Sequence, residues 1–299
     1  MMAIQVDLLS QPSIKRPAPK PSWLKVSLPH GDDYERVNAK VRNLELNTVC
    51  REALCPNIAE CWGRGTATIM ILGDTCTRGC RFCAVKTGNP KGHVDWLEPQ
   101  RVAKAVRDLG WRYLVLTAVD RDDLPDGGAL IFANTVRAIH QTVTGARVEV
   151  LSGDYRGDLR ALEIVMDAQP DVFAHNLETV RRLTPRVRDK RAKYEQSLAI
   201  LRHAKQRAPQ RYTKTSIMIG LGEEQAEIEE AMDDARAAGV DIFTIGQYLQ
   251  PTKRHLPVSE FVTPQRFDEL GKLGRSKGFH QVVSSPLSRS SYHAEEAFS

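Results

Sequence analysis

The sequence predicts an α/β fold, a partial (β/α)6 TIM-type barrel with N-terminal and C-terminal extensions. Three observations support it: short apolar runs recur from residue 67 onward, amphipathic helical stretches separate them, and several runs end in polar or glycine-rich sequence. Continuous apolar strands that alternate with helices indicate a parallel sheet buried on both faces. About six such units can be counted in the 299 residues, fewer than the eight of a closed barrel. A doubly wound sheet would satisfy the same pattern.

The expected elements follow one another in a regular order. The strands are expected at residues 67–74, 113–119, 146–154, 171–178, 214–222 and 241–249. The helices are expected at residues 98–110, 128–143, 159–169, 194–206, 223–239 and 264–279. Residues 280–286 are a candidate for one more strand. We therefore expect an N-terminal extension over residues 1–66, a barrel over 67–283 and a tail over 284–299, with extended chain, a short helix and a cysteine-bearing loop in the extension.

The polar ends of the strands are expected to meet at one site, because functional loops follow the carboxyl ends of strands in such folds. Residues 120–123 follow one strand with three aspartates and an arginine, and His175, Asn176 and Glu178 end another. Gly127 and Gly128 indicate a sharp turn or a close approach of the backbone.

Composition narrows the class of protein. The hydrophobic fraction of 41% is ample for a core, and no apolar run approaches the length of a membrane span. The net charge of +5 is mild and does not indicate nucleic-acid binding. We expect a cytoplasmic protein without a membrane partner, and in a reducing cytosol clustered thiols more often bind metal than form disulfides.

The six cysteines form two triplets. The first, C-x4-C-x5-C, comprises Cys50, Cys55 and Cys61, and the second, C-x3-C-x2-C, comprises Cys76, Cys80 and Cys83. Structural zinc prefers four ligands in C-x2-C pairs, although His93 could complete the second set. Cubane iron–sulfur clusters also take four thiolates. A triplet therefore leaves one iron open for a ligand other than cysteine.

The second triplet, on a loop after the first expected barrel strand, resembles the signature of the radical S-adenosylmethionine superfamily. The resemblance implies that the open iron of a [4Fe–4S] cluster chelates the methionine amino and carboxylate groups of the cofactor. One electron then cleaves the cofactor and releases a 5′-deoxyadenosyl radical. It also implies that Phe82 packs near the adenine, and that His175, Asn176 and Glu178 contact the ribose or the methionine moiety.

Residues 23–294 resemble the lipoyl synthase family more closely. The blocks that carry the resemblance are PSWLKV, VCREALCPNIAECWGRGTATIMILGDTCTRGCRFCAVKTG, LTAVDRDDLPDGGA, FAHNLETV, IMIGLGE, TIGQYLQPTKRHLPV and RSSYHA. Two positions depart from the family pattern: Ala174 replaces an expected asparagine, and Ser288 a frequent valine.

This resemblance implies insertion of sulfur at C6 and C8 of an octanoyl chain, which is amide-linked to a carrier lysine. The carriers are octanoylated lipoyl-carrier domains, namely E2 subunits and the glycine cleavage H protein, and the reductant is one such as ferredoxin or flavodoxin. An auxiliary [4Fe–4S] cluster on the first triplet is the sulfur donor. Its fourth ligand is implied to be Ser291, with Ser290 as the alternative.

Other hypotheses remain open from the residues. They are another radical enzyme with an auxiliary cluster, either biotin synthase-like or methylthio-transferring, a non-enzymatic iron–sulfur protein, and a structural zinc protein. The stretch 181–214 is rich in arginine and lysine. A solvated helical face explains it, and a docking surface for an acidic carrier, formed by Arg186, Arg188 and Arg191, is the functional hypothesis.

Overall fold

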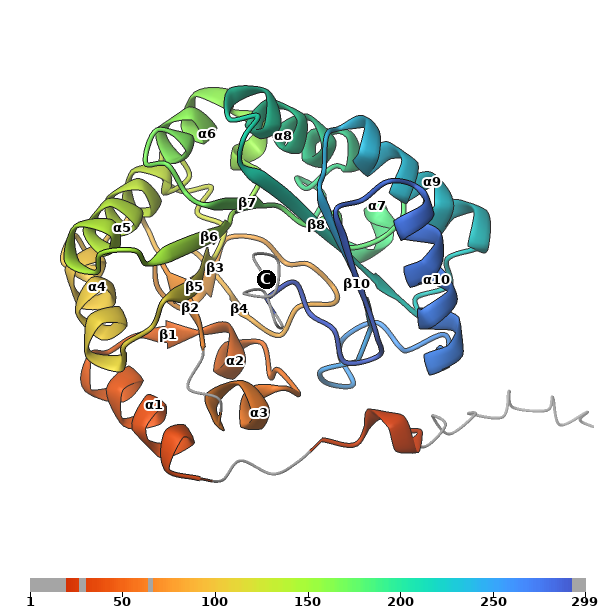
Figure 1. Ribbon diagram of the computed structural model, residues 1–299, viewed down its shortest axis with the longest axis horizontal. Helices are drawn as coiled ribbons and strands as arrows, with labels where there is room; N and C mark the ends of the chain where they lie inside the picture. The colour runs from red at the N-terminus through yellow and green to blue at the C-terminus, as the bar shows by residue number, and fades with distance from the viewer. Residues whose placement is uncertain (1–19, 27–30, 64–66, 292–299) are drawn as a thin grey trace, which may run out of the picture.

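The computed structural model describes residues 20–26, 31–63 and 67–291, and in them a curved sheet lies inside a ring of helices (Figure 1). The sheet has eight strands in the order β1-β2-β5-β6-β7-β8-β9-β10. All neighbouring pairs in this described sheet are parallel except β1 and β2. The strands are β1 (Asn47–Thr48), β2 (Thr68–Ile71), β5 (Tyr113–Ala118), β6 (Arg147–Leu151), β7 (Val172–Ala174), β8 (Tyr212–Ile219), β9 (Ile242–Gln247) and β10 (Gln281–Ser284).

Six helices connect successive parallel strands and form the outer wall. They are α4 (Glu98–Leu109), α5 (Ala129–Thr142), α6 (Leu159–Met166), α8 (Tyr194–Arg207), α9 (Gln225–Ala237) and α10 (Pro264–Ser276). The short helix α7 (Thr184–Val187) lies between β7 and α8. The prediction of six β/α units is confirmed, and the candidate strand after α10 is β10, which pairs with β9.

Helix α4 illustrates why these segments form helices. Its apolar residues recur at helical spacing, so that Val102, Val106 and Leu109 are buried on one face. Pro99 in the first turn suits a helix start, and Gly110 ends the helix in the left-handed conformation with φ of 69°. The buried face packs against β-strands and α5, and this burial holds the helix on the barrel.

A buried ion pair closes the barrel interior near the amino ends of the strands. The Lys214 ammonium on β8 lies 3.0 and 3.1 Å from the two carboxylate oxygens of Glu149 on β6. The hydroxyl of Tyr113, the first residue of β5, donates to the same carboxylate at 2.6 Å. Both charged side chains are almost completely buried. This pair fills the end of the barrel opposite the strand ends that form the site.

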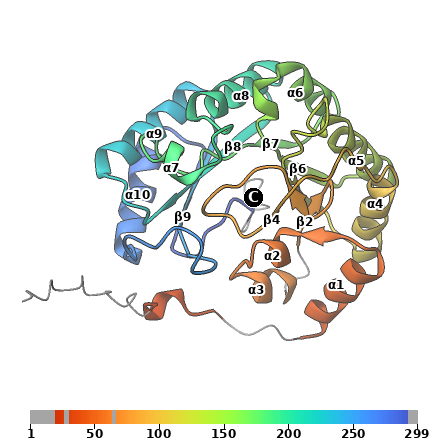
Figure 2. The ribbon, with the colours of Figure 1, turned by 180° about the vertical axis from the view of Figure 1, so that it is seen from behind.

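The N-terminal extension packs against the barrel. Helices α1 (Asp32–Asn43), α2 (Val49–Glu52) and α3 (Ile58–Gly63) lie beside β1 and β2, as seen from both faces (Figures 1 and 2). Val37 and Val41 of α1 belong to the same hydrophobic core as β2, α4 and α5. The expected cysteine-bearing loop is wrong in part, since Cys50 lies in α2 and Cys61 in α3. The division of the chain into extension, barrel and tail at residues 66 and 283 stays a prediction.

The C-terminal tail returns to the barrel after β10. The Ser285 amide donates to the Ile245 carbonyl, and the Gln247 amide donates to the Pro286 carbonyl, both at 3.2 Å. The tail therefore follows β9 along its carboxyl end. Of the RSSYHA block, Arg289, Ser290 and Ser291 are described, and residues 292–294 lie outside the described residues. Within the described part, no helix combines the length and the apolar character that crossing a membrane requires.

Candidate functional site

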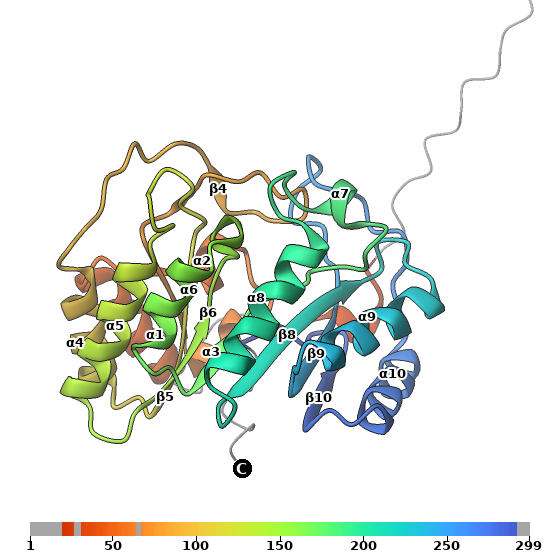
Figure 3. The ribbon, with the colours of Figure 1, turned by 90° about the horizontal axis from the view of Figure 1, so that it is seen from above.

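The second cysteine triplet lies on the long connection that follows β2. Cys76 is in the short strand β3 (Thr75–Cys76), which pairs with β4 (Lys86–Thr87) and so folds the loop back on itself. The Gly88 amide donates to the Cys76 carbonyl at 2.9 Å. Figure 3 shows β4 and α7 at the same end of the barrel. The triplet is thus held over the carboxyl ends of the strands.

Arg78, between the first two cysteines of this triplet, fastens the loop to the barrel. Its guanidinium is 2% exposed and binds Asp122 with two bonds of 2.9 Å. It also lies 2.7 Å from Asp154 at the end of β6 and 3.6 Å from Asp120 at the end of β5. A planar guanidinium can pair with several carboxylates at fixed angles, which an ammonium cannot do. Arg78 therefore sets the position of Cys76 relative to two strand ends.

Further hydrogen bonds fix the rest of the loop. The Thr77 amide donates to the Asp120 carbonyl at 2.9 Å, and the Asp189 amide donates to the Cys80 sulfur at 3.3 Å. His255 bonds the Cys83 carbonyl through Nε2 at 3.0 Å. Hydrogen bonds from three different parts of the barrel therefore hold the loop at or beside each cysteine of the triplet.

The three thiols of the second triplet are partly buried, and their pKa values are raised. Burial raises the pKa of Cys76 and of Cys83 to about 11 and that of Cys80 to about 12, with the Asp120 carboxylate adding to each rise. Neighbouring cysteines of the triplet also raise the pKa of Cys80 and of Cys83. A thiolate in such a place needs a compensating positive charge. The donor set fits a cationic iron–sulfur cluster, which binds deprotonated sulfur.

The first triplet lies on the N-terminal extension. Thr48 caps α2 by accepting from the Arg51 amide at 3.4 Å, and this turn places Cys50 in the interior, 7% exposed. Burial raises the pKa of Cys50 to about 11 and also raises that of Cys55. Leu54, with φ of 52°, makes the turn between these two cysteines. The same chemistry of buried thiols fits a second cluster here.

The C-terminal tail closes over the first triplet. The Asn57 side-chain amide, between Cys55 and Cys61, donates to the Leu287 carbonyl at 2.8 Å across 230 positions of sequence. A Cβ at Gly246 of β9 would lie 2.1 Å from the Ser288 carbonyl oxygen, so only glycine lets the tail pass here. Arg289 is held by its bond to the Ser288 carbonyl at 2.6 Å, and burial lowers the pKa of its guanidinium while Cys55 opposes that shift.

Both triplets reach one cavity of about 610 Å³. Its lining includes Cys55 of the first triplet, Ser290 and Ser291 of the tail, and the whole second triplet, Cys76, Cys80 and Cys83. Residues after the strand ends, Asp120, Asp154, His175, Asn176 and Glu178, complete the lining together with Phe82 of the cysteine loop. The expectation that polar strand ends converge is confirmed, and the tail serine from the far end of the chain meets them there.

The predicted cofactor-contacting residues occupy different situations within this cavity. His175 is buried with both ring nitrogens engaged, Nδ1 with the Ser152 carbonyl at 2.9 Å and Nε2 with the Ser197 hydroxyl at 2.8 Å. Burial lowers its pKa to about 4, which keeps the ring neutral. The Asn176 amide donates to Glu178 at 3.2 Å, and Glu178 has a strained φ of 68°.

Two buried oxygen atoms indicate where a ligand would bind. Asp154 Oδ2 and Asn176 Oδ1 lack a hydrogen-bond partner among the described residues, and both side chains line the cavity. Buried acceptors left in this way cost about 1–3 kcal/mol each. The amino and hydroxyl groups of S-adenosylmethionine are donors that would satisfy them, so the cavity fits that cofactor. In the described part, no three His, Cys, Asp or Glu side chains converge on a position for a single metal ion.

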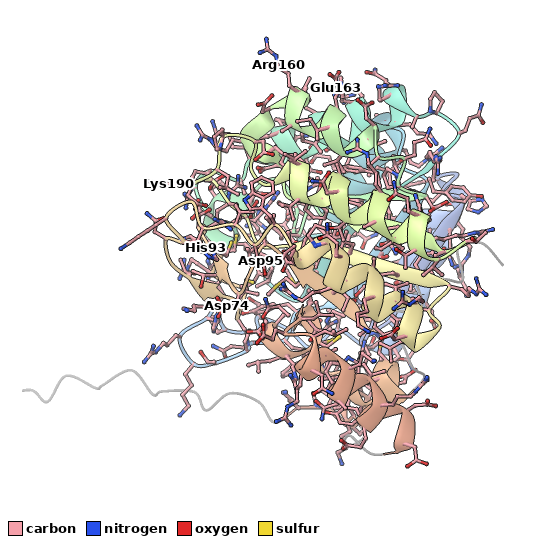
Figure 4. The ribbon with its side chains drawn as sticks, turned by 90° about the vertical axis from the view of Figure 1, so that its left-hand side faces the viewer. Asp74, His93, Asp95, Arg160, Glu163 and Lys190 are labelled. Atoms are coloured by element: carbon pink, nitrogen blue, oxygen red, sulfur yellow. The ribbon has the colours of Figure 1, made fainter. Side chains whose placement is uncertain are left out.

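The structure does not place His93 at a metal site, and it places part of the basic stretch over residues 181–214 in the interior. His93 is exposed on an outer loop near Asp95 and is not part of the cavity lining (Figure 4). Arg188 is buried and donates to the Leu177 carbonyl and the Ser197 hydroxyl, while Arg191 pairs with Asp189 and lies 3.1 Å from an Asp122 oxygen. The docking hypothesis is therefore wrong for Arg188, which is buried, and it stays a prediction for the exposed Arg186 and the partly exposed Arg191. Carboxylates of α9 pair with the exposed Arg181 and Arg182.

Several residues of the site were not identified from the sequence. Arg78 and Asn57 lie between cysteines of the two motifs, and only this position in the sequence could have indicated that they belong to the site. The glycines at 127 and 128 were expected to allow close approach, and a Cβ at Gly128 would lie 2.2 Å from the side chain of Leu72. Gly246 carried no comparable signal, since its neighbour in space is a tail residue remote in sequence.

Comparison with known proteins agrees with this geometry. The family model of the Radical SAM superfamily matches residues 70–235, and that of the N-terminal domain of lipoyl synthase matches residues 11–55. A lipoyl synthase of Thermus thermophilus is 58% identical over 287 residues, which cover 95% of this chain and 89% of that protein. One from Pyrobaculum arsenaticum is 55% identical over 280 residues, covering 93% and 94%.

Solved structures with low sequence identity share the fold. The hydrogenase maturase HydG from Carboxydothermus hydrogenoformans has a TM-score of 0.56 at 15% identity, covering 76% of this chain and 55% of that one. Methylornithine synthase has a TM-score of 0.54 at 14% identity, covering 86% and 72%. The match of residues 70–235 to the Radical SAM superfamily assigns this fold to radical S-adenosylmethionine enzymes. Together with relatives 55–58% identical along nearly the whole sequence, these matches show that the chain belongs to the lipoyl synthase family.

Proposed function

We propose that the chain inserts two sulfur atoms, at C6 and C8, into an octanoyl chain that is amide-linked to a lysine of a carrier protein. S-adenosylmethionine is the source of the radical, and an auxiliary [4Fe–4S] cluster is the source of sulfur. The observation that carries the proposal is the shared cavity, which is lined by the second triplet, by Cys55 and by Ser291. A radical and a sulfur donor that act on one alkyl chain have to face the same enclosed space.

The two triplets have different tasks in this proposal. Cys76, Cys80 and Cys83 would hold the cluster that, when bound, supplies one electron for reductive cleavage of S-adenosylmethionine. Asp154 and Asn176 would accept hydrogen bonds from the cofactor through the oxygens that now lack partners. Phe82 lines the cavity beside Cys83 and packs against the hydrophobic core, which gives the adenine an apolar surface. Exclusion of water from the occupied cavity would protect a reactive carbon radical.

The auxiliary cluster would be held by Cys50, Cys55, Cys61 and the Ser291 hydroxyl. Serine oxygen is a harder ligand than thiolate and holds iron less firmly, which suits a cluster that gives up sulfur. Asn57 and Gly246 support this assignment, because both fix the tail next to the first triplet. Ser290 also lines the cavity and is the alternative ligand.

The partners follow from the same chemistry. An octanoyl chain on a lysine reaches the cavity only when a carrier domain docks, and lipoyl-carrier domains such as E2 subunits and the glycine cleavage H protein are the proposed carriers. The electron comes from a low-potential donor such as ferredoxin or flavodoxin.

Anaerobic reconstitution tests this function. The protein is incubated with S-adenosylmethionine, a reductant and an octanoyl-lysine peptide, and mass spectrometry is expected to show a gain of two sulfurs with formation of 5′-deoxyadenosine. Replacement of Cys76, Cys80 or Cys83 by alanine should abolish 5′-deoxyadenosine formation. Replacement of Cys50, Cys55 or Cys61 should leave some cofactor cleavage but no sulfur gain. Cleavage without sulfur gain in the unaltered protein would contradict the proposed substrate.

A further inference from the structure

Three segments meet at the loop that holds Cys80 and Cys83. The Arg81 amide, between these two cysteines, donates to the Val187 carbonyl of α7 at 2.9 Å, and the Arg81 carbonyl accepts from the Leu256 amide at 3.2 Å. Helix α7 and the segment that follows β9 lie at the same end of the barrel (Figure 3). The cysteine loop, α7 with the residues after it, and the segment after β9 therefore share one surface.

Five exposed cationic side chains lie on these three segments, and we call them the basic patch. They are Arg81, Arg186, Lys190, Lys253 and Arg254. Among the described residues, no carboxylate forms an ion pair with any of the five, and the Arg81 guanidinium reaches only the Arg186 carbonyl, at 3.5 Å. By contrast, Arg181 and Arg182 of the same basic stretch pair with carboxylates of α9. The basic patch therefore keeps its positive field, which an acidic protein surface would complement.

The cysteine loop is the wall between the basic patch and the cavity. Cys80 and Cys83 line the cavity, whereas Arg81 between them is exposed and is not part of the lining. The amide of Asp189 donates to the Cys80 sulfur at 3.3 Å, and the next residue is Lys190, which lies at the surface (Figure 4). An electron that arrives at the basic patch therefore has only this loop to cross before it reaches the second triplet.

The position of the basic patch distinguishes between two kinds of acidic partner. None of its five residues lines the cavity, which reaches solvent beside the N-terminal extension, where its lining residues Lys20, Val26 and Leu54 are exposed. A carrier domain that delivers an alkyl chain has to dock at an opening of the cavity. A protein that delivers an electron only has to come close to the cluster. The basic patch therefore favours an electron carrier over the acidic lipoyl carrier that the sequence analysis considered for Arg186.

We propose that the basic patch is the docking surface of an acidic one-electron carrier protein, which reduces the cluster held by Cys76, Cys80 and Cys83. This inference rests on the proposed function, since it needs a cluster on the second triplet. The carrier is oxidised by one electron, the cluster is reduced by one electron, and no atom is transferred. Complexes of electron-transfer proteins bury less than about 1,200 Å², so a local group of charges is the expected form of such a site.

The test compares two triple variants of the reconstituted full chain that have the same net charge. The patch variant carries Arg186→Glu, Lys190→Glu and Arg254→Glu, and the control variant carries Arg137→Glu, Arg160→Glu and Arg202→Glu, at exposed positions of the outer helices α5, α6 and α8. Arg81 is retained, so that the cysteine loop is unaltered. Association with a purified flavodoxin and with an octanoylated carrier domain is measured by biolayer interferometry at low and high salt, and thermal unfolding checks the fold.

The three charge reversals should slow association of flavodoxin with the patch variant by at least about tenfold at low salt, with no such change in the control variant. The difference should nearly vanish at about 1 M salt, where the Debye length is about 3 Å. Formation of 5′-deoxyadenosine by the patch variant should fall by a similar factor with reduced flavodoxin and stay unchanged with dithionite, because a small reductant needs no docking surface. Both variants should bind the octanoylated carrier domain alike.

Equal slowing of flavodoxin association in both triple variants would show an effect of net charge alone and would overturn the inference, as would weaker binding of the octanoylated carrier domain by the patch variant. If the patch variant unfolds, Arg254→Glu alone is expected to slow association by about threefold at low salt, and an unchanged rate overturns the inference.

The association measurement with flavodoxin needs neither S-adenosylmethionine nor an octanoyl substrate. A chain that docks flavodoxin through the basic patch but inserts no sulfur would contradict only the proposed function. Sulfur insertion with dithionite, by a chain whose association with flavodoxin is independent of the basic patch, would contradict only this inference.

Discussion

Gly246→Ala should separate the two halves of the proposed reaction. The added Cβ would lie 2.1 Å from the Ser288 carbonyl oxygen, and ordinary contact begins at 3.4 Å. The carbonyl must therefore move by about 1.3 Å, or β9 must give way by that amount. The strand is central and buried, while the tail is tied by a few hydrogen bonds. We expect the tail to move.

The displacement is large for Ser291, the proposed cluster ligand, which lies three residues further along the tail than Ser288. Metal–ligand distances tolerate about 0.2 Å, so a Ser291 displaced by this amount could not serve as the proposed ligand. A misplacement of about 1 Å can cost about 100-fold in rate, and overpacking costs about 1–3 kcal/mol of stability. Sulfur insertion should therefore fall by about 100-fold, while 5′-deoxyadenosine formation continues because the second triplet is not touched.

The assay measures both products by mass spectrometry and stability by thermal unfolding. Gly271→Ala in α10 is the control, because its Cβ would meet only the Ser284 side chain at 3.3 Å and an adaptable arginine. Asn57→Ala unties the same tail without a steric clash, so it provides a second measurement if Gly246→Ala folds poorly. Full sulfur insertion by both Gly246→Ala and Asn57→Ala would refute the role that we assign to the tail.

Three further predictions concern groups that hold the barrel. Arg78→Lys cannot reproduce the bonds to three carboxylates, so 5′-deoxyadenosine formation should be lost while iron at the first triplet is retained; cofactor cleavage at the unaltered rate would contradict this. Lys214→Met leaves Glu149 buried without its partner and should cost about 3–5 kcal/mol in urea unfolding, and a loss below about 1 kcal/mol would show that water reaches the pair. Burial lowers the pKa of His175 from 6.5 to about 4, so the folded protein holds this ring neutral. The resulting contribution to the free energy of unfolding is complete above pH 6.5 and is lost as the pH falls toward 4. This contribution is about 3 kcal/mol, and His175→Asn should have a shallower acid slope than the unaltered protein; equal slopes would assign the loss to other groups.

Much of the architecture follows from the sequence because burial imposes local periodicity. The strands and helices of the barrel lie where apolar runs and amphipathic stretches alternate, and β10 follows α10 at the expected position. The two cysteine spacings likewise separate two sets of three ligands, since short spacings confine thiols to one loop or turn. The site's donor types, its position at the strand ends and the family resemblance were all available from the order of residues.

Only the tertiary structure decided which distant residues share a site. In sequence the basic stretch indicates a charged surface, yet Arg188 is buried and Arg191 pairs with Asp122 on another loop. The link from Asn57 to Leu287 crosses most of the chain, and the need for glycine at 246 arises from a carbonyl in the tail. Periodicity reports whether a side chain is buried, because its neighbours in sequence share one strand or helix. Which partner a buried group meets depends on how the curved sheet brings remote segments together, and no local pattern records that.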